Sequence, residues 1–495
     1  MSSNVGDKLW HLCHTLRHDG IGYMDYIEQI TYLLFLKMAD EKGIDLPKGC
    51  RWPDLRDLAG ETLTDTYVEV LRKLGKAGGI LTEIYAGAQS RFTKPVNLKA
   101  VINLIDEVEW TSLGVDVKAE AYEHLLEKAA SEGKKGAGQY FTPRKLMQSI
   151  CRCVRPDPRA AKEFTVSDPA CGTGGFLVCA YEWLMDQTKG GAIDRDLAKR
   201  VRSKTYVGQD LTAQPRRLAL MNLFLHNVTP HIGSGDTIYD PPPTEKFDVI
   251  LTNPPFGTKG AGQTPNRDDF TVETSNKQLN FVQHILTVLK PGGRAAVVLP
   301  DNCLFADQAG EVFKVLTEEC NLHSVLRLPR GTFTPYCQGV KANVVFFQKG
   351  TPTKHVWIYD ARTNVPGITK KDRPLTSEHF AEFERCYGTD PNGRFGPKQG
   401  KGRDEHDSPA GEKGWLGGNR WKKFNIDEVK ERDFKLDGFK WIKDESLDDA
   451  DDLPEPEELA TDAISELEAA VEELQLVLGL LDNSAEPAAA QEARG

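Results

Sequence analysis

Short runs of β-branched residues alternate with segments of helical character between residues 119 and 350. Strands separated by helices need crossover connections, which produce a parallel-rich, doubly wound α/β sheet. The expected strands are Phe164–Ser167, Thr205–Gly208, Thr229–Gly233, Phe247–Thr252, Arg294–Leu299 and Asn343–Phe347. Because ligands of such sheets bind at the carboxyl ends of the strands, the loops that follow these runs are the candidate sites.

The loop after the first expected strand is rich in glycine and opens a helix. Its sequence is Asp168-Pro169-Ala170-Cys171-Gly172-Thr173-Gly174-Gly175-Phe176. Glycine lets the backbone pass close to a ligand, and free amides at the start of the helix can meet a carboxylate or a phosphate. The loop matches neither G-x-G-x-x-G nor a phosphate-binding loop, which would continue with Gly-Lys-Ser/Thr. It predicts a ligand loop of another kind, with a plain strand-to-helix turn as the alternative.

Acidic residues follow the next two expected strands. Asp210 ends the run Val207-Gly208-Gln209-Asp210, and Asp236 follows Gly235. A carboxylate at the end of the second strand can accept hydrogen bonds from ribose hydroxyls, as in related nucleotide folds. We expect Asp210 to bind a ribose and Asp236 to contact the adenine ring of the same ligand. A purely structural role is the alternative for Asp210.

The run Val249-Ile250-Leu251 leads into Asn253-Pro254-Pro255-Phe256 at the end of another strand. Two consecutive prolines cannot continue a sheet and force a rigid, extended loop. Such a loop suits methylation of an aromatic amine, whose lone pair is delocalised into the ring. Hydrogen bonds from its two protons to the Asn253 side-chain oxygen and the Pro254 carbonyl would free that lone pair. Phe256 offers a face to a base extruded from a duplex, and the catalysis needs positioning more than a strong base.

A further run lies upstream, where Gln139, Tyr140, Phe141 and Thr142 precede Pro143 at an expected helix start. Thr142 followed by proline predicts a helix cap with proline at the first helical position. In the functional interpretation, Phe141 packs against the ligand and nearby backbone groups line one end of it. A simple helix start is the alternative.

These loops resemble those of S-adenosylmethionine-dependent amino-methyltransferases in which the cofactor loop precedes the Asn-Pro-Pro-Phe loop. The run 168–176 resembles the loop that binds the methionine part of the cofactor. The resemblance implies a Rossmann-like core and two sets of site residues. The implied catalytic residues are Asn253, Pro254, Pro255 and Phe256. The implied cofactor-binding residues are Gln139, Tyr140, Phe141, Thr142, Asp168, Pro169, Ala170, Gly172, Thr173, Gly174, Gly175, Phe176, Asp210, Asp236 and Asn253.

Further stretches make the resemblance closest to the modification (M) subunit of type I restriction-modification systems. These stretches are Tyr23–Lys37, Gly138–Pro143, Leu326–Pro329, Gly339–Val344 and Asp433–Trp441. The resemblance implies N6 of adenine as the methylated atom and double-stranded DNA as the substrate. It also implies two M subunits assembled with one specificity (S) subunit that reads the site. A restriction (R) subunit with ATP-dependent translocation would join them to cleave unmodified DNA.

We expect the chain to divide into four regions. They are an N-terminal helical domain (1–118), the catalytic domain (119–385), a glycine-rich loop with an aromatic stretch (386–443), and an acidic helical tail (444–495). Apolar stripes within 26–38 and 100–105 support helices in the first region.

The acidic tail contains an expected helix over about residues 457–482 with a heptad seam. Its apolar residues, spaced by three and four, are Ile464, Leu467, Val471, Leu474, Leu478 and Leu481. Two alternatives stay open: the helix folds back onto its own chain, or it packs against helices of another subunit.

The charge is unevenly distributed along the chain. The formal net charge is −11, yet residues 444–495 hold 17 acidic residues and one basic residue, so the remainder carries +5. The mildly basic charge of residues 1–443 is compatible with DNA binding. Because this charge is small, a partner is expected to supply much of the affinity if DNA is bound tightly.

Other features bear on location and metal binding. No run approaches the roughly 18 to 20 apolar residues of a membrane span, and residues 1–9 lack the apolar stretch of a signal peptide. The ten cysteines are scattered, with no C-x-x-C pair and no zinc spacing. We expect a cytoplasmic protein with reduced thiols, no membrane contact and no metal.

Two other functions are compatible with parts of the sequence. A protein glutamine N5-methyltransferase faces the same chemical problem at an amide nitrogen, but such enzymes are typically shorter and lack a long heptad-bearing C-terminal region. A catalytically silent scaffold is opposed by the intact Asn253 and glycine loop. The residues after the catalytic core are mostly glycine-rich or acidic. Recognition of base edges in a groove needs a rigid element, which such a sequence is poorly suited to form. Site choice is therefore expected to belong to a partner.

Overall fold

The computed structural model describes residues 22–110, 122, 125–126, 128, 141–188, 193–256, 264–334, 339–393 and 420–443. The chain divides into two compact units, Met1–Asn253 with Val288–Val297, and Pro254–Thr287 with Val298–Gly495. The expected tail helix and most of the glycine-rich stretch lie outside the described residues. The four region boundaries expected from the sequence stay predictions.

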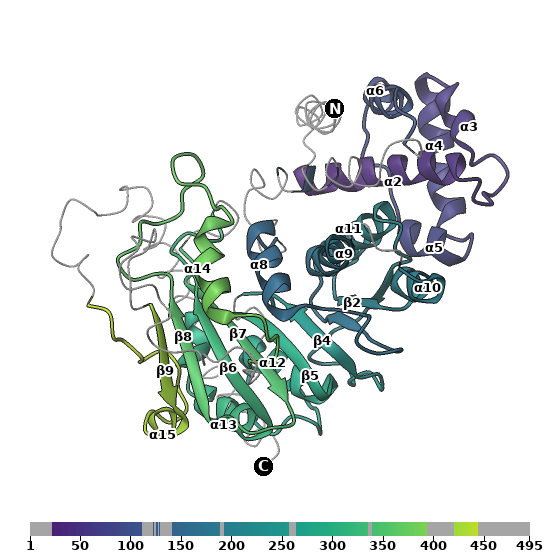
Figure 1. Cartoon of the computed structure of the whole chain (residues 1–495). Coiled ribbons are helices and arrows are strands. Elements are labelled where there is room, and N and C mark those ends of the chain that lie inside the picture. The colour runs from purple at the N-terminus through teal and green to yellow at the C-terminus, as the bar shows by residue number, and fades with distance from the viewer. Residues whose placement is uncertain are drawn as a thin grey trace, which may run out of the picture. The chain divides into compact units, whose positions relative to one another are not determined.

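Helices α2 to α6 form the N-terminal part of the first unit (Figure 1). They are α2 (Tyr23–Glu41), α3 (Trp52–Arg56), α4 (Gly60–Leu74), α5 (Gly79–Tyr85) and α6 (Pro95–Asp106). The apolar stripe predicted along α2 is too narrow, because residues 26–36 are all buried, including Gln29 and Thr31. Helix α2 packs against α6 and also against α11 (Ala213–Leu225), so it is covered on more than one side. The buried side-chain amide of Gln29 has both hydrogen-bonding groups paired: it donates to Gln89 O and accepts from the Arg91 amide.

The sheet of the first unit is parallel throughout, in the order β3-β2-β1-β4-β5. Its strands are β1 (Val166–Asp168), β2 (Tyr206–Asp210), β3 (His231–Ser234), β4 (Phe247–Thr252) and β5 (Leu289–Pro300), of which β5 runs on into the second unit after Val297. The connecting helices are α8 (Arg144–Val154), α9 (Gly175–Gln187), α10 (Arg195–Ser203) and α11. Helix α9 packs on β1 and β4, α11 packs on β2, and α8 packs on α9 (Figure 1). The predicted doubly wound, Rossmann-like core with an N-terminal helical region is confirmed.

The second unit contains a smaller mixed sheet in the order β7-β6-β8-β9. Its elements are α12 (Lys277–Val288), the 3-10 helix η2 (Asp301–Leu304), α13 (Ala309–Glu319), β6 (Cys320–Arg327), β7 (Ala342–Lys349), β8 (His355–Asp360), α14 (Glu378–Tyr387), β9 (Trp421–Asn425) and α15 (Ile426–Lys430). Strand β6 runs antiparallel to β7 and parallel to β8, and β9 runs antiparallel to β8.

An aromatic cluster holds β8, β9 and α14 together. Trp357 stacks on Trp421 with ring centroids 5.2 Å apart and planes 13° apart. Phe383 of α14 makes edge contacts with Tyr359 and Trp421. The aromatic stretch noted after the glycine-rich segment is thus partly a strand of this sheet, which the sequence reading did not predict.

The described residues include no helix long and apolar enough to cross a membrane. The cysteines of these residues are buried free thiols. Within the same part of the chain, no cluster of three His, Cys, Asp or Glu side chains has the arrangement of a metal site.

Candidate active site

The glycine loop makes a tight turn between β1 and α9. Gly172 and Gly174 have φ angles of 52° and 79°, values that side chains disfavour. The Gly174 amide donates to Cys171 O at 2.7 Å, and a Cβ on Gly174 would lie 3.2 Å from Ala219 Cβ on α11. Glycine is required here because the turn is left-handed and packs closely on a neighbouring helix.

Asp168 ends β1 with its carboxyl group buried at 2% exposure. Thr252 Oγ1 donates to Asp168 Oδ1 at 2.7 Å, and the Ala170 amide donates to the same oxygen at 3.1 Å. Burial raises the pKa of Asp168 to about 7, against the lowering effect of these two hydrogen bonds. Asp168 therefore fixes the start of the glycine loop to the end of β4.

Asp210 ends β2 and is tied to the same loop. Its Oδ2 accepts from the Gly172 amide at 3.0 Å, and its Oδ1 accepts from the Thr212 amide and hydroxyl at 2.9 and 2.7 Å. Burial raises the pKa of Asp210, partly offset by the Thr212 and Gly172 hydrogen bonds. The expected ribose-binding carboxylate thus lies beside the glycine loop.

Asp236 follows β3 and organises the turn after it. Its Oδ1 accepts from the Ile238 and Tyr239 amides at 3.0 and 3.2 Å. The preceding Gly235 amide donates to Asp210 O at 3.3 Å. Three carboxylates therefore lie at the carboxyl ends of the adjacent strands β1, β2 and β3.

The Asn253 side chain lies against the segment before α8. Asn253 Nδ2 donates to Thr142 Oγ1 at 2.9 Å, a contact between residues 111 positions apart. The other amide atom, Oδ1, is buried, and no described residue donates a hydrogen bond to it. The cap prediction for Thr142 is wrong: α8 begins at Arg144 with Pro143 as its N-cap and no side-chain cap, because the Thr142 hydroxyl serves Asn253 instead.

The rest of the Asn-Pro-Pro-Phe loop belongs to the second unit. Pro254 is buried and Pro255 is half-buried. The side chain of Gln278 donates to Pro255 O at 2.6 Å. The half-buried ring of Phe256 meets Phe333 edge-on, with ring centroids 5.5 Å apart and planes 86° apart.

Other predicted residues take supporting places. Pro169 O accepts from the Thr237 hydroxyl at 2.6 Å, and Phe176 is 2% exposed in α9. The structure also describes four other predicted residues, all in the first unit: Phe141, Ala170, Thr173 and Gly175. Two more, Gln139 and Tyr140, lie outside the described residues. Three residues of the site, Thr252, Gln278 and Phe333, were not predicted from the sequence. Of these, Phe333 had a signal, because it lies just after the Leu326–Pro329 stretch.

Comparisons with known proteins agree over most of the chain. The family model for N-6 DNA methylases matches residues 114–450, and the model for the HsdM N-terminal domain matches residues 5–43. The type I restriction enzyme EcoKI methylase subunit of Escherichia coli (strain K12) is 38% identical over 97% of this chain and 95% of its own. The StySPI methylase subunit of Salmonella potsdam is 37% identical over 95% of this chain and 94% of its own.

Solved structures give the same picture. A structure that addresses complex assembly and conformational transition of the type I R-M system has a TM-score of 0.72 at 27% identity, covering 98% of this chain and 99% of that one. The crystal structure of the EcoKI M protein has a TM-score of 0.53 at 33% identity, covering 99% and 100%.

A doubly wound sheet with a glycine loop after β1 and Asn-Pro-Pro-Phe after β4 defines an amino-methyltransferase of the Rossmann-like class. The chain belongs to the N-6 DNA methylase family, within the methylase subunits of type I restriction enzymes. It is an adenine-specific DNA methyltransferase and the modification subunit of a type I restriction-modification system, as the sequence predicted. The protein glutamine methyltransferase and the silent scaffold are not favoured.

Proposed function

We propose that S-adenosylmethionine is the methyl donor and that it lies at the carboxyl ends of β1, β2 and β3. The donor set supports this choice: Asp168, Asp210 and Asp236 are acceptors suited to hydroxyl, amino and ammonium groups. The loop 168–176 contains no basic residue, which does not suit a polyphosphate. Asp210 would hold the ribose, Asp236 the adenine, and the glycine loop with Phe141 and Thr142 the methionine part. Bound there, the cofactor supplies a methyl group on a positively charged sulfur.

The amine of the target adenine is held by two consecutive residues in this proposal. One amine proton is donated to Asn253 Oδ1 and the other to the Pro254 carbonyl. The observation that carries the proposal is the buried Oδ1 of Asn253, which lacks a donor among the described residues. Leaving such an acceptor unpaired costs about 1–3 kcal/mol, so a substrate donor at that place is expected. The two hydrogen bonds draw the nitrogen lone pair out of conjugation with the ring.

Phe256 and Phe333 form an aromatic corner in the second unit. An adenine inside a duplex is out of reach, so the target base must leave the stack and find a new surface. The face of Phe256 supplies that surface, and edge-on packing by Phe333 fixes the orientation of the Phe256 ring. The corner therefore offsets part of the lost stacking energy.

We also propose that the chain works as two copies with one specificity subunit, joined by the restriction subunit when unmodified DNA is cleaved. The full-length similarity to type I methylase subunits and the mildly basic charge of residues 1–443 support this assembly. The tail 444–495, with its heptad seam, is the candidate contact. Because its DNA substrate and S-adenosylmethionine would be available in the cytoplasm, we propose that the complex is cytoplasmic.

Asn253→Ala tests the proposal most directly. In the complex with the specificity subunit, it is expected to abolish transfer of labelled methyl groups to DNA and leave S-adenosylmethionine affinity by calorimetry largely intact. Retained methylation would show that the amine is activated elsewhere. Absence of cofactor binding by the unmodified protein would remove the cofactor assignment itself.

A further inference from the structure

The catalytic loop has an unusual shortage of backbone donors. Pro254 and Pro255 have no N–H, so neither can anchor the loop by donating a hydrogen bond. These two residues can be held only through their carbonyls and their packing. Since the proposed chemistry uses the Pro254 carbonyl for substrate, the Pro255 carbonyl is the next anchor along the backbone.

Gln278 provides that anchor from the first turn of α12. Its Nε2 donates to Pro255 O at 2.6 Å, and the residue is only 2% exposed. The start of α12 is fixed by Asn276, whose Oδ1 accepts from the Leu279 amide at 3.1 Å. The buried amide of Gln278, on a helix with a capped N-terminus, therefore binds the carbonyl of Pro255. This carbonyl is the one that follows the Pro254 carbonyl, the proposed acceptor for the adenine amine.

The other end of the Gln278 amide is also engaged. The fully buried Cys303 thiol lies 3.7 Å from Gln278 Oε1, and the side-chain oxygens of Asn302 and Asn276 lie 3.6 and 3.9 Å from the same sulfur, so three acceptors compete for its single proton. Burial raises the pKa of Cys303 to about 12, so the thiol keeps its proton at neutral pH. A donor near Oε1 agrees with the orientation in which Nε2 meets the Pro255 carbonyl.

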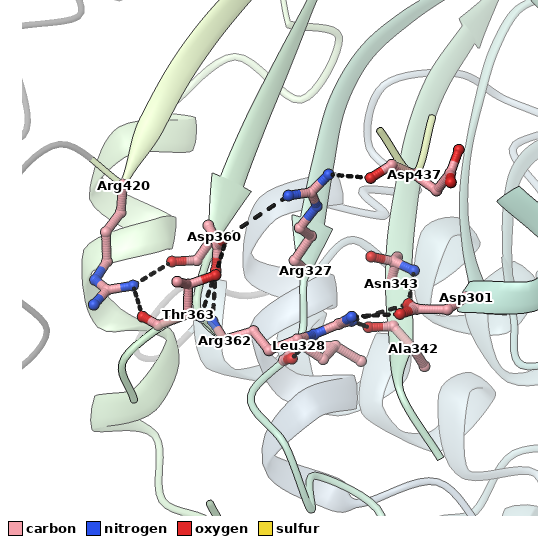
Figure 2. Close-up of polar contacts among 10 residues, drawn as sticks. All are labelled: Asp301, Arg327, Leu328, Ala342, Asn343, Asp360, Arg362, Thr363, Arg420 and Asp437. Atoms are coloured by element: carbon pink, nitrogen blue, oxygen red, sulfur yellow. Dashed lines mark hydrogen bonds and ion pairs between the residues drawn. The ribbon is translucent and has the colours of Figure 1, made fainter. Parts of the chain in front are cut away.

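Asp301, the first residue of the short helix η2 that also contains Cys303, is held by a polar network (Figure 2). Arg362 donates to both oxygens of Asp301 at 2.5 and 3.1 Å, and Asn343 Nδ2 donates to Asp301 Oδ1 at 2.8 Å. Arg362 also donates to Ala342 O at 2.8 Å. Residues from β7 and from the end of β8 thus fix the short helix that carries the thiol.

We propose that Gln278 is a positioning residue that sets the geometry of the catalytic loop by holding the Pro255 carbonyl. The proposal rests on the proposed role of Asn253 and Pro254 in holding the adenine amine. Gln278 itself touches neither base nor cofactor in this account. Its loss misplaces the neighbouring Pro254 carbonyl and leaves the binding surfaces in place.

The test uses the full chain assembled with its specificity subunit and DNA from a strain that lacks this methyltransferase. Gln278→Leu keeps the size of the side chain and removes the donor. We expect single-turnover methylation to slow by about tenfold to a hundredfold, since displacements near 1 Å at a reacting centre have costs of this order. Affinity for S-adenosylmethionine and for DNA is expected to stay unchanged.

Gln283 offers a matched control on the same helix. It is 3% exposed, and its amide donates to Val272 O at 2.9 Å, away from the Asn-Pro-Pro-Phe loop. Gln283→Leu disturbs α12 at least as much and is expected to keep the methylation rate. An equal loss of rate in both variants would overturn the proposal in favour of a general defect of the helix.

Gln278→Glu gives a pH signature that simple structural support would not show. A buried carboxyl group has a raised pKa and can donate to Pro255 O only while protonated. Relative to the wild type, the Glu variant should regain rate as the pH falls from 8 to 6, whereas the Leu variant should not. Parallel pH profiles for the Glu and Leu variants, or an unchanged rate in Gln278→Leu, would refute the role of Gln278. Failure of the wild type to methylate adenine would instead refute the proposed function.

Discussion

Asp168 is a carboxyl group whose ionised form is costly where the fold places it. Its side chain is 2% exposed, and burial raises its pKa from 3.8 to about 7 despite hydrogen bonds from Thr252 and Ala170. Asp168→Asn keeps the shape and an acceptor oxygen while removing the titration. The variant therefore isolates the cost of this one charge.

The sign follows from proton binding. Because the folded pKa lies above the unfolded one, the stabilisation from protonated Asp168 is complete below pH about 4 and is lost as the pH rises through about 7. A shift of this size corresponds to about 4 kcal/mol in all, at about 1.4 kcal/mol per unit. About 2.5 kcal/mol of the loss falls between pH 5 and pH 8.

The assay is urea unfolding of both proteins at pH 5, 6.5 and 8. The difference in free energy of unfolding between them should move by about 2.5 kcal/mol in favour of Asn at pH 8, while groups common to both cancel. Asp269→Asn is the control: burial raises the pKa of Asp269, but hydrogen bonds from Arg267 and Thr287 lower it to about 2, so it stays ionised throughout. A constant difference for Asp168→Asn across this range would refute the reasoning.

Three further predictions concern the loops and the tail. Thr142→Val removes the hydroxyl that accepts from Asn253 and should lower the single-turnover rate about tenfold or more, whereas Thr142→Ser should keep it. Gly331→Ala should lower the free energy of unfolding by about 2–3 kcal/mol in thermal unfolding, because Gly331 has a φ of 74° and a Cβ would overlap the Ile368 carbonyl. Deletion of 454–495 should weaken assembly with the specificity subunit by native mass measurement, and unchanged stoichiometry would favour the tail folding back on its own chain.

The buried central strand β4 was predictable because it is a short apolar run that contains Val249 and Ile250. The expected run Phe247–Thr252 coincides with β4. Strand β9 was missed because its sequence, Trp-Lys-Lys-Phe-Asn, follows a glycine-rich charged stretch and buries only part of its length. What makes it a strand is pairing with β8, more than 60 residues earlier, and stacking of Trp421 on Trp357. Edge strands of this kind depend on their partner more than on their own propensity.

The site residues named from the sequence were those whose chemistry requires a particular residue type. Their supports were not predictable, since they depend on contacts across the chain. The hydroxyl of Thr142 looks like a helix cap until Asn253 is placed beside it. Gln278 and Gln283 are both buried glutamines of α12, yet Gln278 donates to Pro255 O, whereas Gln283 donates to Val272 O.

The order of strands in the first unit has a consequence for biosynthesis. Strand β4 pairs with β5 from Phe247↔Leu289 to Thr252↔Val297, so this side of β4 is covered only by residues made about 40 positions later. Until β5 leaves the ribosome, the nascent chain presents an apolar strand with unpaired backbone groups, a template for pairing with other chains. Truncations that end between 253 and 288 are therefore expected to aggregate during expression.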